Sequence, residues 1–526
     1  MQSTKALTEW AFTMLKSNPY IPMRYVNLFC TLILLAGLSI PAKSQFHIRG
    51  QIISATEKED LKLNMPLVFG FYASNSLHIP VAKDGSFALE IPIKEARFAN
   101  LIYQKKFFQL LLRPGKDLQI MLKKADTSLH LVSGSALTVN EVVQQADIEE
   151  YPSFFNKENT YYTPFSVQQL QQQVVIPYFA KCNEKIRRVM QSDISETDKQ
   201  KISGELTAIT YNYLNDLFRT ANLNRSVADS LIIQVFDRSD IQIQPSGPQF
   251  YAFVDNYVRY LETKAFHRIK AEHIAPSEAI PYFGISLDSA NKFVNKYSKA
   301  QWRFLGAIQN LPPAIAEKYT YQLIVSSINY KELKQAADLA GAFRQQFPKS
   351  TYLPAIANAM KGLESLLVEN EHNAAIKIIP EMEKITSVYD MIKSLKGKVI
   401  YLDVWGTWCG PCKAELPYVP KLKEKFKDKP VAFVYLDMDE DDKDNDWRNF
   451  IKVNAIEGLH LRKSRKDIAA FWKELLADAS DKAEYYPQYF IFDPNGKLVI
   501  TKAARPSSED ILYKQLNTIL GKTTLK

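Results

Sequence analysis

The chain has 526 residues, of which 46% are apolar and 23% are charged, and its formal net charge at pH 7 is +9. A chain of this length is expected to form two or three domains. The positive charge is spread along the chain without a basic run, which argues against a nucleic-acid-binding protein. With only four cysteines, the fold is not expected to depend on disulfide staples.

The N-terminus has the pattern of an export signal. Met23–Arg24 precedes an apolar run at 26–38, and small residues follow that run. The run is too short for a comfortable transmembrane helix. We therefore predict that residues 1–44 are a cleaved signal peptide and that the mature protein is periplasmic. A retained membrane anchor is the alternative, and residues 1–22 form an extension that leaves Met23 as a possible true start.

Residues 45–140 have the pattern of short strands. Apolar side chains alternate with polar ones, for example at Phe87, Leu89 and Ile91. Asp84–Gly85 supplies turn chemistry between two such runs. This pattern predicts an all-β domain of antiparallel strands, sandwich-like or an open barrel.

Residues 141–380 have helical periodicity and predict an α-helical domain. The apolar residues recur at helical spacing in five long runs: Gln169–Met190, Lys201–Asn222, Gln249–His267, Ala314–Ile328 and Lys331–Phe347. Aromatic residues are dense here, and at this spacing they belong to a core more often than to a binding groove. We interpret Cys182, in the first run, as a buried apolar residue, and a third redox thiol is the alternative.

A Cys-x-x-Cys motif joins two well-defined patterns. The run 398–405 is almost entirely apolar, as in a strand buried on both faces, and 413–427 has helical spacing. Cys409 is therefore expected at a helix N-terminus, where free N–H groups and the helix dipole stabilise a thiolate. Cys412 follows one turn later, within reach of a disulfide. Between them, Gly410 allows a close backbone approach and Pro411 suits a first helical turn.

Other interpretations of the motif require groups that the sequence does not supply. A zinc site would need two more soft ligands, and the histidine closest in sequence is His460. The acidic loop 437–446 suggests calcium, but Asp442 and Arg448 stand where an EF-hand loop needs glycine and an acid. A purely structural disulfide is the remaining alternative. We predict redox chemistry, with no metal and no bound cofactor.

Two stretches carry a resemblance to a known family. The stretch from Asp403 to Cys412, together with Tyr486–Pro487 and the apolar run after it, resembles the thioredoxin superfamily, in particular its TlpA-like exported branch. The resemblance covers 381–526 and implies a C-terminal α/β thioredoxin-like domain. Tyr486 departs from the family, which commonly has a smaller residue before its cis-proline. A final helix is expected to be capped by Ser507 with Asp510.

The resemblance also implies roles for individual residues. Cys409 is expected to lie nearer the surface and to be the attacking thiolate, and Cys412 is expected to be more buried and to be the resolving cysteine. Asp403 is expected to accept the proton of Cys412, because a buried acid with a raised pKa can act as a base near neutrality. The substrate groove is expected to be formed by Trp408, Gly410, Pro411, Tyr486 and Pro487, with Trp405 in its apolar wall.

These patterns lead to two hypotheses about function. The first is a periplasmic thiol–disulfide oxidoreductase that reduces disulfides of exported proteins and receives electrons from a membrane thiol–disulfide donor. Reduction is favoured because the Gly-Pro pair between the cysteines resembles that of reducing relatives. The alternative is a periplasmic binding or scaffold protein, in which the β and helical domains define the function and the redox module is ancillary.

Overall fold

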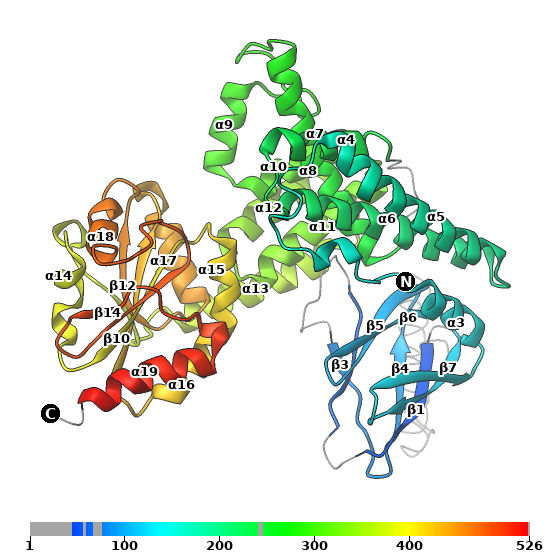
Figure 1. The fold of residues 1–526 in the computed structure, drawn as a ribbon, viewed down its shortest axis with the longest axis horizontal. Coiled ribbons are helices and arrows are strands. Elements are labelled where there is room, and N and C mark those ends of the chain that lie inside the picture. The colour runs from blue at the N-terminus through cyan, green and yellow to red at the C-terminus, as the bar shows by residue number, and fades with distance from the viewer. Residues whose placement is uncertain (1–44, 56–58, 67–75, 240–245, 524–526) are drawn as a thin grey trace, which may run out of the picture. The chain divides into compact units, whose positions relative to one another are not determined.

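The computed structural model describes residues 45–55, 59–66, 76–239 and 246–523, and Figure 1 shows its ribbon. The predicted signal peptide lies outside these residues. The chain divides into two compact units, 1–257 and 258–526, so the division falls within one helix. Within the described ranges, no helix is long and apolar enough to cross a membrane.

The first unit begins with two four-stranded sheets, in the orders β4-β1-β7-β8 and β3-β2-β5-β6. The strands are β1 (Gln45–Ile53), β2 (Leu61–Asn64), β3 (Ser76–His78), β4 (Ser86–Pro92), β5 (Arg97–Tyr103), β6 (Lys106–Leu112), β7 (Asp117–Lys123) and β8 (Ser128–Ser133). Phe46 and Leu118 of one sheet share a single core with Leu61 and Leu101 of the other, as in a sandwich. One detail of the prediction is wrong: β1 and β7 pair in parallel. Alternation reports a half-buried strand and carries no information on its direction.

Helices complete the first unit and enclose Cys182. They are α3 (Leu137–Ala146), α4 (Val167–Leu170), α5 (Ile176–Gln191), α6 (Glu196–Thr220), α7 (Arg225–Phe236) and the first part of α8 (Pro248–Ala271). Cys182 of α5 is 6% exposed and belongs to the same core as the strands. Its Sγ lies 3.4 Å from the Leu206 carbonyl oxygen, and burial raises the pKa of the thiol. The predicted apolar role of Cys182 is confirmed, since a thiol in such surroundings is inert.

The second unit begins with the rest of α8 and continues with further helices. These are α9 (Leu287–Lys296), α10 (Lys299–Asn310), α11 (Pro313–Asn329), α12 (Leu333–Gln346) and α13 (Leu353–Glu369). The predicted runs at 314–328 and 331–347 correspond to α11 and α12. Helical residues thus occur in both compact units, and the domain boundaries at 140 and 380 stay predictions.

The C-terminal part of the second unit is an α/β domain around a six-stranded sheet (Figure 1), with the order β14-β13-β10-β11-β12-β9. The strands are β9 (Ile376–Ile378), β10 (Val399–Trp405), β11 (Val431–Met438), β12 (Gly458–Lys463), β13 (Gln488–Phe492) and β14 (Leu498–Ile500). The first four of these are parallel, whereas β13 and β14 run antiparallel to their neighbours. β9 adds a strand to this sheet just before residue 381, where the predicted domain starts.

β10 is the central strand, and it is held from both faces. All seven of its residues are buried, as the apolar run predicts. Leu402 packs on one face with α18 (Ile468–Leu475) and α14 (Val388–Ile392). Tyr401 packs on the other with α16 (Val419–Phe426) and α19 (Asp510–Thr523). Each large side chain buried in this way contributes about 1.5–3 kcal/mol to folding. The Cys-x-x-Cys motif therefore follows a rigid strand.

Candidate active site

The motif lies at the junction between β10 and a short helix, α15 (Gly410–Glu415), as the sequence predicts. Cys409 is the N-cap residue of α15, and its Sγ accepts a hydrogen bond from the Cys412 N–H at 3.2 Å. Pro411 stands in the first turn, where its missing N–H leaves no helical bond unmade. A sulfur at an N-cap receives backbone donors and the positive end of the helix dipole, which stabilise a thiolate.

Cys409 and Cys412 form a disulfide, with a Cα–Cα distance of 5.3 Å. Cys409 is 2% exposed and Cys412 is 3% exposed. The expectation that Cys409 lies nearer the surface is therefore wrong for the oxidised state, because Trp405, Tyr435 and Phe450 pack in the same cluster as both cysteines. The distinction between attacker and resolver thus depends on the N-cap position of Cys409.

Two aromatic side chains border the disulfide, and one of them is open to solvent. Trp408 is 52% exposed, and its ring centroid lies 5.2 Å from that of Tyr486. Tyr486 in turn accepts a hydrogen bond from Trp472 Nε1 at 3.1 Å. Trp405, by contrast, is 1% exposed. It packs in the buried cluster that contains both cysteines and does not form a groove wall.

The peptide bond between Tyr486 and Pro487 is cis, as the resemblance implies. The bond directly precedes β13, the antiparallel neighbour of β10. Tyr486 also packs against the cluster that contains both cysteines. The structure thus brings together the motif and the predicted proline loop, which are 74 residues apart in the sequence.

Asp403 lies within β10 and is 7% exposed. Its Oδ1 has no hydrogen-bond partner among the described residues. Burial, and then the charge of Glu415, raise the pKa of Asp403 well above its ordinary value. A carboxyl group with a raised pKa is a stronger base than an ordinary carboxylate, so it can exchange a proton with a neighbouring group more readily.

Glu415 is a site residue that the sequence analysis missed. It ends α15 and is 6% exposed. It accepts hydrogen bonds from the Ser507 N–H at 2.9 Å and from the Ser507 hydroxyl at 3.0 Å. Ser507 therefore bonds Glu415, and the predicted capping box with Asp510 is wrong. The available signal was spacing, since an acid three residues after Cys412 lies on the same helix face.

A second pair of buried acids supports the loop before Cys409. Asp439 accepts hydrogen bonds from the Thr407 N–H at 2.9 Å and from the Thr407 hydroxyl at 3.0 Å. Asp437 is fully buried, and burial together with Asp439 raises its pKa well above the ordinary value. Asp439 thus fixes the turn that carries Trp408 and Cys409.

The rest of the acidic loop faces a guanidinium group. Arg462 Nη1 donates to the Asp439 carbonyl oxygen at 2.9 Å and to Asp441 Oδ1 at 3.0 Å, and Arg462 Nε donates to Asp444 Oδ1 at 3.0 Å. This arginine therefore supplies the positive charge that the calcium interpretation would assign to a metal ion. Among the described residues, no group of three or more metal-binding side chains gathers at one place.

The position of Trp408 should depend on Gly406. A Cβ added at Gly406 would lie 2.5 Å from Trp408 Nε1 and 3.1 Å from the Met438 carbonyl oxygen, the group to which Nε1 donates at 2.7 Å. We expect Gly406→Ala to break this bond, which contributes about 1 kcal/mol, and to displace the indole.

The measurement is tryptophan fluorescence together with the rate of disulfide exchange, both of which should change in Gly406→Ala. Gly362→Ala is the matched control, because Gly362 is exposed on α13 and a Cβ added there meets no described atom within 4 Å apart from its chain neighbours and the backbone of its own helix. An unchanged spectrum in Gly406→Ala, or an equal change in both variants, would show that Gly406 does not set the position of Trp408.

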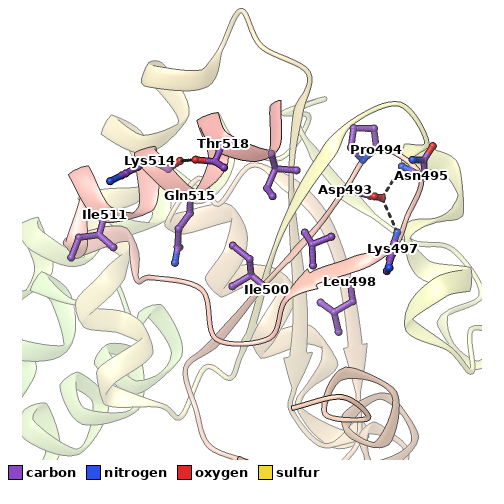
Figure 2. Close-up of a pocket in the computed structure, with 12 residues that line it drawn as sticks. Asp493, Pro494, Asn495, Lys497, Leu498, Ile500, Ile511, Lys514, Gln515 and Thr518 are labelled. Carbon is purple, nitrogen blue, oxygen red and sulfur yellow. Dashed lines mark hydrogen bonds between the residues drawn. The ribbon is translucent and has the colours of Figure 1, made fainter. Parts of the chain in front are cut away.

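A groove also lies elsewhere in the C-terminal domain, between the edge strand β14 and α19 (Figure 2). Its volume is about 980 Å³, and Leu498, Ile500 and Gln515 are among its lining residues. Neither cysteine lines it, and neither do Trp408, Tyr486 or Pro487. It therefore plays no part in the site described above.

Comparison with known proteins agrees with this geometry. The Redoxin family matches residues 368–516. Thiol-disulfide oxidoreductase ResA of Bacillus thuringiensis is 35% identical over 109 residues, which are 20% of this chain and 56% of that protein. The ResA of Bacillus subtilis is 28% identical over 128 residues, which are 24% and 65% of the two chains. The chain thus spans little more than half the length of the first of these relatives.

The chain is also similar to part of several solved structures. A Bacteroides vulgatus protein, solved in solution as a candidate thiol-disulfide oxidoreductase, is 33% identical. The match covers 25% of this chain and 78% of that one, with a TM-score of 0.21. Its match, like those of the curated relatives, covers about a quarter of this chain or less. A redoxin domain of the thioredoxin superfamily therefore occupies residues 368–516 of this chain.

Proposed function

We propose that this protein is a periplasmic thiol–disulfide oxidoreductase that reduces disulfides of exported proteins through Cys409 and Cys412. The observation that carries the proposal is the disulfide at the N-terminus of α15, with Cys409 as the N-cap. The neighbouring cis-proline loop and the Redoxin match support it. A structural disulfide would not need a thiolate-stabilising position.

The reaction begins with the reduced dithiol. The Cys409 thiolate attacks one sulfur of the substrate disulfide, forms a mixed disulfide and releases the first substrate thiolate. Asp403 takes the proton of Cys412, directly or through water. The Cys412 thiolate then attacks Cys409 Sγ, which releases the second substrate thiolate and forms the Cys409–Cys412 disulfide. Two electrons pass to the substrate, and a membrane thiol–disulfide protein is proposed to restore the dithiol.

The remaining groups have supporting roles in this proposal. Pro487 and Tyr486 receive the substrate backbone beside the motif, and Trp408 provides an exposed apolar surface. Gly410 leaves open space at the start of the helix, since a Cβ built there meets no described atom within 4 Å apart from its chain neighbours and the backbone of its own helix. No step requires a metal ion or an organic cofactor. Location in the periplasm follows from the predicted signal peptide and would be tested by cell fractionation.

The reduction potential of the dithiol tests the proposed direction. We expect the reduction potential of the Cys409–Cys412 couple to lie closer to that of thioredoxin, about −270 mV, than to that of a strong oxidant, about −120 mV. Equilibration with glutathione, followed by alkylation and mass spectrometry, measures it. A potential above the about −180 mV of protein disulfide isomerase would replace the reductase by an oxidase or isomerase.

A further inference from the structure

The second compact unit contains a cleft next to Trp408, with a volume of about 540 Å³. One wall belongs to the helical segment α9–α12 and includes Lys299 and Leu333. The other wall belongs to the redox domain and includes Thr407 and Trp408. The helical segment therefore borders the same exposed indole that flanks the disulfide.

Specific polar contacts hold the helical wall against the redox domain. Glu332, directly before α12, forms an ion pair with Lys413, the residue after Cys412. The side chains of this pair are only 14% and 15% exposed. Asn454 Nδ2 also donates to the Lys331 carbonyl oxygen at 3.5 Å. The wall is thus anchored at the redox helix itself.

The cleft carries an excess of positive charge. Six of its lining residues are cationic and four are acidic, which gives a net charge of 6 − 4 = +2. Two of the acids are engaged, since Glu332 pairs with Lys413 and buried Asp439 bonds Thr407. Two further cations are engaged as well, since Lys334 pairs with Asp338 and Lys443 with Asp442. Lys296 and Lys299 are exposed on the helical wall.

Arg465 extends this positive charge toward the proline loop. It lines the cleft and is exposed. It also lies close enough to Tyr486 to oppose the rise that burial causes in the pKa of that phenol. The cationic surface therefore extends from the helical wall past Trp408 toward Tyr486.

We propose that this cleft binds an acidic polypeptide segment next to the substrate's reactive disulfide, so that the helical region selects substrates for the redox site. The inference rests on the proposed function. Both cysteines are almost fully buried whereas Trp408, which lines the cleft, is half exposed, so a partner sulfur that reaches the motif beside Trp408 passes next to the cleft. The residues that flank this sulfur then lie in the cleft. Complementary charge speeds encounter and discriminates between partners.

The test uses the reduced full-length protein and three peptides, each with one cysteine in a mixed disulfide with thionitrobenzoate. Four neighbouring residues are Asp, Asn or Lys in the three peptides. We expect the second-order rate constant for the acidic peptide to exceed that for the neutral one by roughly tenfold at low salt, since complementary charge speeds encounter and several weak exposed ion pairs act together. The basic peptide should be slowest, and the differences should shrink at about 1 M salt.

The double variant Lys296→Glu with Lys299→Glu should reverse the order of the acidic and basic peptides. The readout is the ratio of their rates, so a general loss of activity cancels. Lys361→Glu is the matched control, because Lys361 is exposed on α13 and does not line the cleft, and it should keep the wild-type ratio. Equal rates for the three peptides, or a double variant with the wild-type ratio, would overturn the proposal.

Two small disulfides serve as further substrates. One tests whether the cleft binds a polypeptide or any small anion, and the other tests the activity of the dithiol independently of the cleft. Oxidised glutathione is acidic but short, and we expect it to react more slowly than the acidic peptide. An equal rate would overturn the polypeptide assignment in favour of a small anionic disulfide. Hydroxyethyl disulfide carries no charge and reports on the dithiol itself. If the wild-type protein failed to reduce it, the proposed function would fail, whereas normal reduction with equal peptide rates would refute the cleft alone.

Discussion

Replacing Cys409 with serine should abolish insulin reduction, whereas Cys412→Ser should leave a protein that attacks its substrates and then stays bound to them. In Cys409→Ser, the N-cap sulfur that the α15 N-terminus stabilises is missing, so no nucleophile remains. In Cys412→Ser, attack still occurs, but the mixed disulfide cannot be resolved. Insulin turnover and non-reducing gels with mass spectrometry would measure the two outcomes.

Cys182→Ser is the control for both variants. Cys182 lies in the core of the other compact unit and its thiol pKa is raised, so this change should leave insulin turnover intact. Mixed disulfides trapped by Cys409→Ser and not by Cys412→Ser would reverse the assignment of attacker and resolver. Full biological activity in both active-site variants would favour the scaffold alternative.

Asp403→Asn should slow resolution of the mixed disulfide by about 100-fold, because general acid–base groups typically contribute 10²–10⁴-fold. Attack by Cys409 should change much less, so mixed disulfide should accumulate. In the wild type, resolution should speed up as pH rises through the raised pKa of Asp403, since only the carboxylate accepts a proton. Stopped-flow traces at several pH values would separate the steps, and a variant with wild-type resolution would exclude Asp403 as the base.

The same substitution should change how stability depends on pH. Because the pKa of Asp403 is higher in the folded protein than in the unfolded chain, the folded state binds the extra proton. The stability that this proton contributes is therefore lost as pH rises from about 4, the pKa of an aspartate in the unfolded chain, to the pKa of Asp403 in the folded protein. The free energy of unfolding falls by at most about 1.4 kcal/mol per pH unit in this range.

We expect Asp403→Asn to lack this loss, so that its free energy of unfolding exceeds that of the wild type increasingly as pH rises. Urea titrations of the oxidised proteins, followed by tryptophan fluorescence, measure the difference. The control is Asp428→Asn, which alters an exposed acid beyond α16 and should keep the wild-type slope. Parallel curves for Asp403→Asn and the wild type would contradict the raised pKa.

The sequence by itself determined the local parts of the site. The continuous apolar run of β10, the turn into a helix and the position of Cys409 at its start follow from patterns within about 30 residues. Hydrophobic period and Gly-Pro chemistry report such local geometry directly. The burial of Cys182 was predictable for the same reason, since its neighbours on one helix face are apolar.

The tertiary structure decided which distant groups meet at the cysteines. Glu415 bonds Ser507 across 92 residues, Asp439 bonds Thr407 across 32, and Glu332 pairs with Lys413 across 81. Periodicity shows which face of an element is buried, but it does not identify the partner on the opposing element. The predictions that Cys409 lies near the surface and that Trp405 forms a groove wall are wrong for this reason. Side chains from other elements cover both residues. The cleft beside Trp408 likewise exists only once the helical segment packs against the redox domain.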